Sequence, residues 1–239
     1  IDNMFPHHED EIAQSEAANG CTYVRYWLHC AHLMVNGEKM SKSLGNFFTL
    51  RDLLAKGYTG RELRWVLLGA HYRKKLNFTF DALDAARETL RKFDDFFRRL
   101  HAACAVSAVS PDEVRQLAAT ADDKFRAALA DDLNISEALA VLFELQRETN
   151  KLLEAGSLDQ AGAELLLSQF RRFDEIFGCL AVDAVAGDAV PAEILALAEA
   201  RQAARKAKDF AKADACRDQL KAAGYVVEDI PGGFRVKPL

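Results

Sequence analysis

Hydrophobic residues recur every three or four positions through most of the chain, which is the spacing of one buried helix face. The clearest stripe lies within residues 80–101 and predicts a long amphipathic helix. Helices joined by short connections predict an up-and-down bundle. Thr49 and Ser136 stand at expected helix N-caps. The same spacing, with local start and stop signals, predicts further helices over residues 6–18, 23–31, 61–72, 112–130, 136–155, 159–177 and 192–223, the last as one helix or a pair.

Two parts of the chain show strand patterns instead. Leu33-Met34-Val35 is followed by Asn36-Gly37, the strongest two-residue hairpin signal, so a short strand is predicted to turn there. Residues 225–227 and 234–236 flank a turn-rich connection and predict a final pair of short strands. With a low-polarity linker at 181–192, the pattern predicts a mainly α fold with a small α/β part.

Composition narrows the class of protein. Half of the 239 residues are hydrophobic, enough to bury a core and to form two or three units. The absence of a run of eighteen apolar residues and of a charged-then-apolar leader predicts neither a membrane span nor a secretory signal. Five scattered cysteines without a Cys-x-x-Cys pair predict reduced thiols in a cytoplasmic protein. Because the chain starts at Ile1, we expect the later part of a longer protein.

The net charge of −5 hides an alternation along the chain. Residues 39–100 carry fourteen basic and seven acidic side chains, and residues 201–239 carry nine basic and five acidic ones. Between them, residues 101–200 carry seven basic and eighteen acidic side chains. Two basic blocks separated by an acidic one predict two contacts with a long polyanion, although ordinary solvated faces explain such blocks equally well.

The order Lys39-Met40-Ser41-Lys42-Ser43 is the most informative motif of the chain. The two lysines supply ammonium donors and the two serines supply hydroxyl donors, a set suited to binding a polyphosphate. Short lysine–serine runs also occur on solvated loops. The exact order resembles the second signature of class I aminoacyl-tRNA synthetases, a mobile loop that holds ATP and stabilises the transition state of amino-acid activation.

A second candidate site lies in the predicted helix 6–18. His7 and Glu11 are four residues apart and so share one face of that helix, where an imidazole and a carboxylate suit Zn²⁺. Two ligands do not make a zinc site, and such a pair is more often a solvated ion pair. Cys21 and Cys30 are the local candidates for completing it, whereas His8 points elsewhere and is expected to serve either in packing or in supporting the ligands from behind.

Seven stretches, in order and at matching spacing, resemble the bacterial cysteinyl-tRNA synthetases. The likeness covers the chain from its first residues to its last. It implies the end of a class I Rossmann-type catalytic domain, then a helical bundle and a small anticodon-binding domain. The stretches are Phe5–Glu16, Tyr26–His29, the lysine–serine motif, Gly69–Phe78, Asp131–Asn134, Ala204–Asp214 and Glu228–Gly232.

The resemblance implies a role for each motif. In that family one zinc ion binds the substrate thiolate through two cysteines, a histidine and a glutamate; the last two fall on His7 and Glu11, and the cysteines are expected upstream of this chain. Thiolate–zinc bonding would select cysteine over serine. The family's ATP-contacting lysine falls on Lys42, with Lys39 its companion, and ATP would act with Mg²⁺.

The same resemblance implies a nucleic-acid partner. The expected partners are tRNA(Cys), L-cysteine and ATP, without a membrane, and the expected state is a monomer. An aromatic or guanidinium plane suits stacking, and carboxylates accept from exocyclic amines. Phe210 stands where the family often has tryptophan. The positions that the family uses to hold and read the anticodon fall on Arg205, Phe210, Asp214, Arg217 and Asp229.

Three functions remain open at this point. The first is a cysteine–tRNA ligase present as a C-terminal portion, inactive alone because the first class I signature, His-x-Gly-His, is absent. The second is a non-catalytic tRNA-binding fragment. The third is a cysteine ligase acting on an amino sugar in thiol-cofactor biosynthesis, which should lack the block at 201–239. The expected divisions are 1–46 (end of the catalytic domain), 47–105 (tRNA stem contact), 106–180 (bundle) and 190–239 (anticodon recognition).

Overall fold

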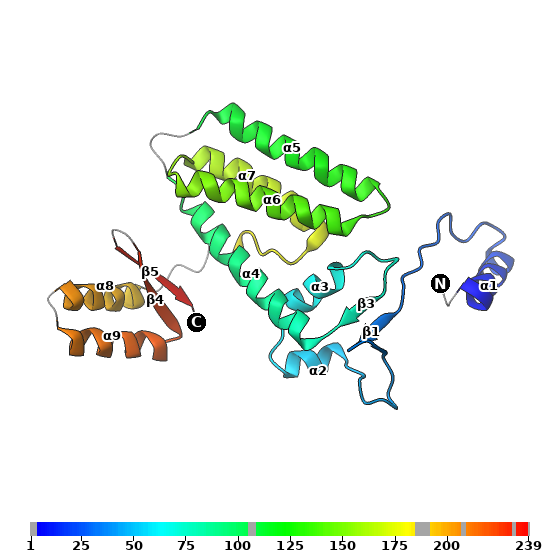
Figure 1. Cartoon of the computed structure of the whole chain (residues 1–239). Helices are drawn as coiled ribbons and strands as arrows, with labels where there is room; N and C mark the ends of the chain where they lie inside the picture. The colour runs from blue at the N-terminus through cyan, green and yellow to red at the C-terminus, as the bar shows by residue number, and fades with distance from the viewer. Residues whose placement is uncertain (1–3, 105–108, 185–191, 207–208, 231–232, 239) are drawn as a thin grey trace. The chain divides into compact units, whose positions relative to one another are not determined.

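The chain divides into two units, Ile1–Val185 and Ala186–Leu239 (Figure 1). This is a computed structural model, and it describes residues 4–104, 109–184, 192–206, 209–230 and 233–238. Both units are mainly helical and each has a small β-sheet, so the predicted fold class is confirmed.

The first unit begins with a π-helical turn, η1 (Met4–His8), that continues as α1 (Glu9–Asn19). Gly20 ends α1 in the left-handed conformation, with a φ of 66°. The helix predicted over 6–18 is thus confirmed. The helix predicted over 23–31 is wrong, because these residues form an irregular segment in which Tyr23, Tyr26 and Trp27 are exposed.

A three-stranded sheet carries the lysine–serine motif at its edge. β1 (Leu33–Val35) lies in the centre, antiparallel to β2 (Glu38–Lys39) and parallel to β3 (Leu76–Phe78). The predicted turn at Asn36 and Gly37 joins β1 to β2, with positive φ values of 51° and 80°. β3 was not predicted, because three residues are too few to show an alternating pattern and, unlike β1, it has no Asn-Gly turn beside it.

Two short helices connect β1–β2 to β3. Each begins with a capping box: Thr49 with Asp52 starts α2 (Leu50–Ala55), and Thr59 with Glu62 starts α3 (Gly60–Leu68). The Thr49 cap is therefore confirmed. The predicted helix 61–72 ends earlier, at Leu68, because Gly69 and the residues after it turn towards β3.

Four long helices complete the first unit: α4 (Phe80–His101), α5 (Pro111–Ala130), α6 (Ile135–Glu154) and α7 (Gln160–Phe177). All four were predicted. α6 is capped by the side chain of Asn134 rather than by Ser136, which lies inside the helix. Leu83 and Ala86 of α4 pack with the sheet, whereas Phe93, Phe96, Phe97 and Leu100 of the same helix pack in the bundle core. One helix thus belongs to both hydrophobic cores.

The second unit is a helix pair with a hairpin. α8 (Ala192–Lys206) packs on α9 (Phe210–Ala222), and β4 (Tyr225–Ile230) pairs antiparallel with β5 (Gly233–Pro238). A small core of Ile194, Ala198, Leu220 and Val236 joins them. The sequence left open whether 192–223 is one helix or two, and the structure has two. The strands are longer than predicted.

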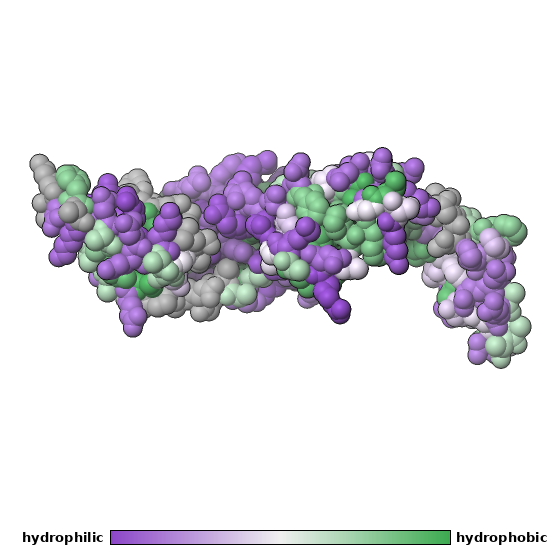
Figure 2. All heavy atoms as spheres, turned by 90° about the horizontal axis from the view of Figure 1, so that it is seen from below, coloured by the Kyte–Doolittle hydropathy of each residue, from purple (hydrophilic) through white to green (hydrophobic). Residues whose placement is uncertain are grey.

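No helix within the described residues is long and apolar enough to span a membrane. Hydrophilic side chains cover most of the face seen in Figure 2, with areas of hydrophobic surface between them. Exposed hydrophobic residues of the first unit include Leu28, Leu67, Leu133 and Ile176. These four also line a cavity described below.

Candidate functional site

The lysine–serine loop, residues 39–46, is closed across its base by one asparagine side chain. Asn46 Oδ1 accepts from the backbone N–H of Ser41 at 2.8 Å, and Asn46 Nδ2 donates to the carbonyl of Lys39 at 3.2 Å. Inside the loop, the backbone N–H of Gly45 donates to the carbonyl of Lys42. Ser41 Oγ accepts from the backbone N–H of Leu44 and lies 3.1 Å from Ser43 Oγ.

The base of this loop is attached to the sheet. The backbone N–H of Gly37 donates to Asn77 Oδ1 at 2.7 Å, and that of Asn36 donates to the carbonyl of Phe78 at 3.1 Å. Met40 is half-buried against the sheet core that contains Val35. The loop therefore leaves a fixed platform and is itself exposed.

Both predicted lysines are exposed on this loop. Lys39 lies in β2, and Lys42 Nζ lies 5.7 Å from the ring centroid of Phe47, within cation–π range. The hydroxyl of Ser43 is also exposed. Two ammonium groups and serine hydroxyls on one short loop can together bind the oxygens of a polyphosphate.

His7 and Glu11 lie at the start of the first unit, in η1 and α1, and both are exposed. Glu11 Oε1 accepts a hydrogen bond from Ser15 Oγ at 2.7 Å. Among the described residues, no three His, Cys, Asp or Glu side chains form a group that could hold a metal. The exposed Cys21 and Cys30 therefore do not complete a local site with this pair. The pair offers two donors of suitable chemistry for zinc.

His8 packs against aromatic rings, as predicted. Its ring centroid lies 3.7 Å from that of Trp27 and 5.4 Å from that of His29. These tilted ring contacts attach η1 to the irregular segment that follows α1. His8 therefore serves in packing, in contrast to His7, the residue before it, which is the candidate zinc ligand.

Four of the five predicted anticodon residues line one cavity of the second unit. Arg205 comes from α8, and Phe210, Asp214 and Arg217 come from α9 at spacings of four and three, so the last three share a helix face. The cavity volume is about 230 Å³. Arg217 Nη1 lies 3.0 Å from Asp214 Oδ1, and Phe210 is 65% exposed.

The fifth predicted residue, Asp229, lies in β4 opposite Phe234, but its side chain is outside the described residues. Sequence reasoning missed Arg201, which lines the same cavity. The signal was present, because Arg201 precedes Arg205 by four residues and so lies on the same face of α8.

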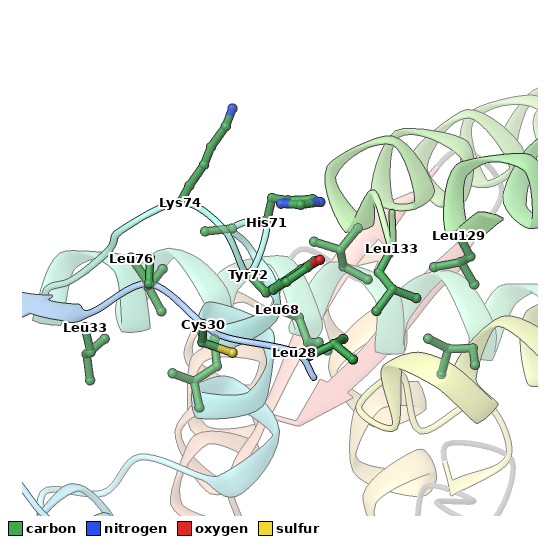
Figure 3. A pocket seen from close by; sticks show the side chains of 15 residues that line it. Leu28, Cys30, Leu33, Leu68, His71, Tyr72, Lys74, Leu76, Leu129 and Leu133 are labelled. Atoms are coloured by element: carbon green, nitrogen blue, oxygen red, sulfur yellow. The ribbon is translucent and has the colours of Figure 1, made fainter. Parts of the chain in front are cut away.

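A larger and mainly apolar cavity of about 540 Å³ lies in the first unit, and sequence reasoning also missed it. Its walls come from residues 28–33 at and before β1, from residues 67–76 between α3 and β3, from residues 129–135 around the α5–α6 turn, and from Ile176 near the end of α7. Figure 3 shows Leu28, Leu68 and Leu133 around it, with Lys74 directed away. The lining residues come together only when the chain folds, so no local sequence pattern predicts the cavity.

A polar cluster fixes one wall of that cavity. Tyr72 Oη donates to Asp132 Oδ1 at 2.6 Å, and Arg73 Nε lies 2.6 Å from Asp132 Oδ2. His71 Nε2 lies 2.8 Å from the carbonyl oxygen of Asp132. The hydrogen bonds from Tyr72 and then Arg73 lower the pKa of the Asp132 carboxyl. These contacts hold Asp132 and Leu133 at positive φ values of 52° and 55°.

Three protein-family models match the chain in succession. Residues 1–88 match the tRNA synthetases class I (C) catalytic domain, residues 124–181 the DALR domain, and residues 187–236 the cysteinyl-tRNA ligase anticodon binding domain. The second unit corresponds closely to the third match.

Curated relatives match along the whole chain. The cysteine–tRNA ligase of Chlamydia felis is 44% identical over 239 residues, which is 100% of this chain and 50% of that protein. That of Solibacter usitatus is 46% identical over 240 residues, 99% of this chain and 51% of that protein. The chain thus spans about half the length of the curated relatives it matches. A solved ternary complex of Agrobacterium radiobacter K84 agnB2 LeuRS, tRNA and LeuAMS covers 66% of this chain and 22% of its own, with a TM-score of 0.46 and 21% identity.

Proposed function

Because the chain belongs to the cysteinyl-tRNA synthetase family, matching its C-terminal portion, we propose that it supplies the ATP-binding loop and the anticodon-reading unit of a cysteine–tRNA ligase. The whole activity would be ATP-dependent activation of L-cysteine and transfer to tRNA(Cys). The observation that carries the proposal is the cavity of the second unit, where Arg205, Phe210, Asp214 and Arg217 meet. The match to an anticodon-binding domain covers the same residues.

In the ATP site, Lys39 and Lys42 would act electrostatically. Their ammonium groups are placed on an exposed loop with a fixed base, where they can neutralise charge that develops on the pyrophosphate of Mg²⁺-bound ATP. Ser41 and Ser43 would add hydroxyl donors. The two hydrogen bonds that Asn46 makes across the base of the loop, here called the Asn46 staple, support this role. They restrict the loop before ATP binds, so less conformational entropy is lost on binding.

His7 and Glu11 are proposed as two of four zinc ligands, with two cysteines coming from sequence outside this chain. Zinc, when bound, would hold the substrate as a thiolate. Within this chain Glu11 is oriented by the Ser15 hydroxyl, and the start of α1 is held to the neighbouring aromatic segment by His8. These contacts support a preset direction for the two ligands.

In the anticodon unit, α9 would read bases. Phe210 offers an exposed ring for stacking, and Asp214 offers a carboxylate that can accept from an exocyclic amine. Asp229 is proposed as a further reader on β4. The proposed divisions remain 1–46, 47–105, 106–180 and 190–239, in a cytoplasmic monomer. The match to an anticodon-binding domain over residues 187–236 argues against the amino-sugar ligase, which should lack this block.

Filter binding of tRNA(Cys) and of an unrelated tRNA over a salt series tests the proposal. We expect tRNA(Cys) to be preferred, and Asp214→Ala to reduce that preference roughly tenfold, as the loss of one base contact predicts. Glu199→Ala is the control, because Glu199 is an exposed carboxylate of the same unit outside the cavity lining. Equal binding of both tRNAs by the unmodified chain would refute anticodon reading.

Catalysis has a separate test. The chain is mixed with a separately expressed N-terminal half of a relative, and cysteine-dependent ATP–pyrophosphate exchange is measured. We expect exchange with the unmodified chain and a loss of at least about 100-fold with Lys42→Ala, the size expected for one transition-state donor. Tight tRNA binding without any exchange would favour the non-catalytic tRNA-binding fragment instead.

A further inference from the structure

The apolar cavity of about 540 Å³ in the first unit is rimmed by exposed hydrophobic side chains. Leu28, Leu67, Leu133 and Ile176 all line it and are 61%, 46%, 50% and 45% exposed. Figure 3 shows Leu28 and Leu133 around the same space as Leu68. Exposed leucines that are scattered singly are ordinary, but leucines that gather around one cavity mark a site of interaction. The cavity is therefore a candidate docking surface.

Hydrogen bonds fix the walls of this cavity before anything binds. The backbone N–H of Ala31 donates to the carbonyl of Tyr72 at 2.8 Å, and the Tyr72 hydroxyl donates to Asp132 Oδ1 at 2.6 Å. These two bonds join the segment before β1, the α3–β3 connection and the α5–α6 turn. Leu33 and Leu76, which pair across β1 and β3, also line the cavity. Because the walls are already in place, little conformational entropy is lost when a partner covers them.

The segment before β1 has the side-chain alternation of a β-strand. Trp27 and His29 contact the ring of His8 on one side, whereas Leu28 and Cys30 line the cavity on the other. These four consecutive residues nevertheless belong to no helix or strand. An extended segment without a strand partner is a template for pairing with another polypeptide. The segment therefore points to a protein partner.

The walls of the cavity belong to two matched domains. Residues 28–33 and 67–76 lie in the match to the catalytic domain, and residues 129–135 and Ile176 lie in the match to the DALR domain. The curated relatives extend over about as many residues again outside the match. Most of the large hydrophobic residues that are exposed in the described part of the chain also lie in the match to residues 1–88. A small apolar molecule would leave these residues exposed, whereas a polypeptide can cover them together with the cavity.

We propose that this cavity is the docking surface for the N-terminal half of the ligase, which places an apolar element on the rim and pairs a strand with residues 27–30. This inference rests on the proposed function and names the surface through which the catalytic domain is completed. Two of the four rim residues, Leu133 and Ile176, lie in the helical bundle. The bundle and the catalytic part of this chain therefore hold the same partner.

The test uses the full chain and the separately expressed N-terminal half of the Chlamydia felis relative, with the affinity measured by titration calorimetry. Leu67→Gln and Leu133→Asn should each weaken binding roughly tenfold, because each removes an apolar contact at the rim. Glutamine suits the helix at position 67, and asparagine tolerates the positive φ at position 133, so both variants should fold. Leu195→Gln is the matched control: this leucine of α8 is 42% exposed and lies outside the cavity lining, so the affinity should not change.

A second measurement needs no substitution. Cys30 lines the cavity and is exposed, so iodoacetamide can alkylate it in the free chain. With the partner at about ten times Kd, alkylation of Cys30 should slow about tenfold, since only the free chain reacts. Cys104 is exposed in the same unit but outside the cavity lining, and its alkylation should not change. Hydrogen exchange of the amides of residues 27–30 should slow as well. If a leucine variant unfolds by circular dichroism, these protection measurements on the unmodified chain decide.

Three results would overturn the inference. The first is a partner that binds Leu67→Gln and Leu133→Asn as tightly as the unmodified chain without protecting Cys30, which would place docking elsewhere. The second is no binding between the two halves. The third is protection of Cys30 that rises with the concentration of this chain alone, which would make a second copy the occupant. All three leave the preference for tRNA(Cys) untouched, because filter binding does not involve the N-terminal half; loss of that preference with docking intact would refute anticodon reading alone.

Discussion

The Asn46 staple makes a quantitative prediction about the lysine–serine loop. Asn46→Ala removes two hydrogen bonds, to the backbone of Ser41 and Lys39, at 2.8 and 3.2 Å. Each such bond contributes about 0.5–1.5 kcal/mol net, and the longer one lies towards the low end. The closed loop should therefore lose about 1–2 kcal/mol relative to open forms, which raises the open population roughly 5- to 30-fold.

Trypsin measures that population directly, since it cleaves after Lys39 and Lys42 and needs an open loop. When opening and closing are fast relative to cleavage, the cleavage rate follows the open population, so it should rise by the same factor. Ser43→Ala is the matched control in the same loop. Its exposed hydroxyl lies 3.1 Å from Ser41 Oγ and takes no part in the contacts of Asn46, so less than about a twofold change is expected. If Asn46→Ala is cleaved no faster than the unmodified chain, the staple does not hold the loop, and the reasoning fails.

Two further predictions concern the stability of the first unit, which tryptophan fluorescence reports in urea. Burial raises the pKa of the Glu62 carboxyl, but hydrogen bonds from Arg87 and from the Thr59 backbone outweigh it and leave the pKa below its usual value. Glu62→Gln should therefore lower the free energy of unfolding by about 1–2 kcal/mol at pH 7. The difference in unfolding free energy between the two chains should shrink as the pH falls from about 5 through the folded-state pKa of Glu62, and a difference that stays constant at all pH values would contradict this. Gly178→Ala should lower the free energy of unfolding by more than the ~1–2 kcal/mol of a left-handed alanine, because the added Cβ would lie 3.0 Å from Arg64 Nε. Gly156→Ala is the control: at a φ of 59° its Cβ meets no neighbour, so only the ~1–2 kcal/mol should be lost. Equal losses in the two variants would contradict a role for the Arg64 contact.

The long helices were predictable from the sequence because their signals are local. Phe80–His101 was predicted to the residue, since its apolar stripe is long and its ends carry Thr79 and a run of basic residues. The segment 23–31 misled, because aromatic residues at helical spacing look the same whether they pack on a helix or on neighbouring rings. β3 was missed because β1, the strand with which it pairs, lies far away in the sequence.

The candidate sites were predictable to different depths. Arg205, Phe210, Asp214 and Arg217 were found through resemblance, and their meeting in one cavity follows from helix spacing plus the packing of α8 on α9. Arg201 followed from spacing alone and was overlooked. The 540 Å³ cavity could not be predicted from the sequence, because residues from four separate segments create it only in the folded chain.

The parallel pairing of β1 with β3 has a consequence for the order of events during synthesis. Gly37 depends on Asn77, which comes 40 residues later in the chain. At a ribosomal rate of about 5–20 residues per second, the loop leaves the ribosome roughly 2–8 s before its anchor does. During this interval the two lysines of the nascent loop lack the support of β3. The segment stays accessible to proteases and chaperones until β3 pairs with β1.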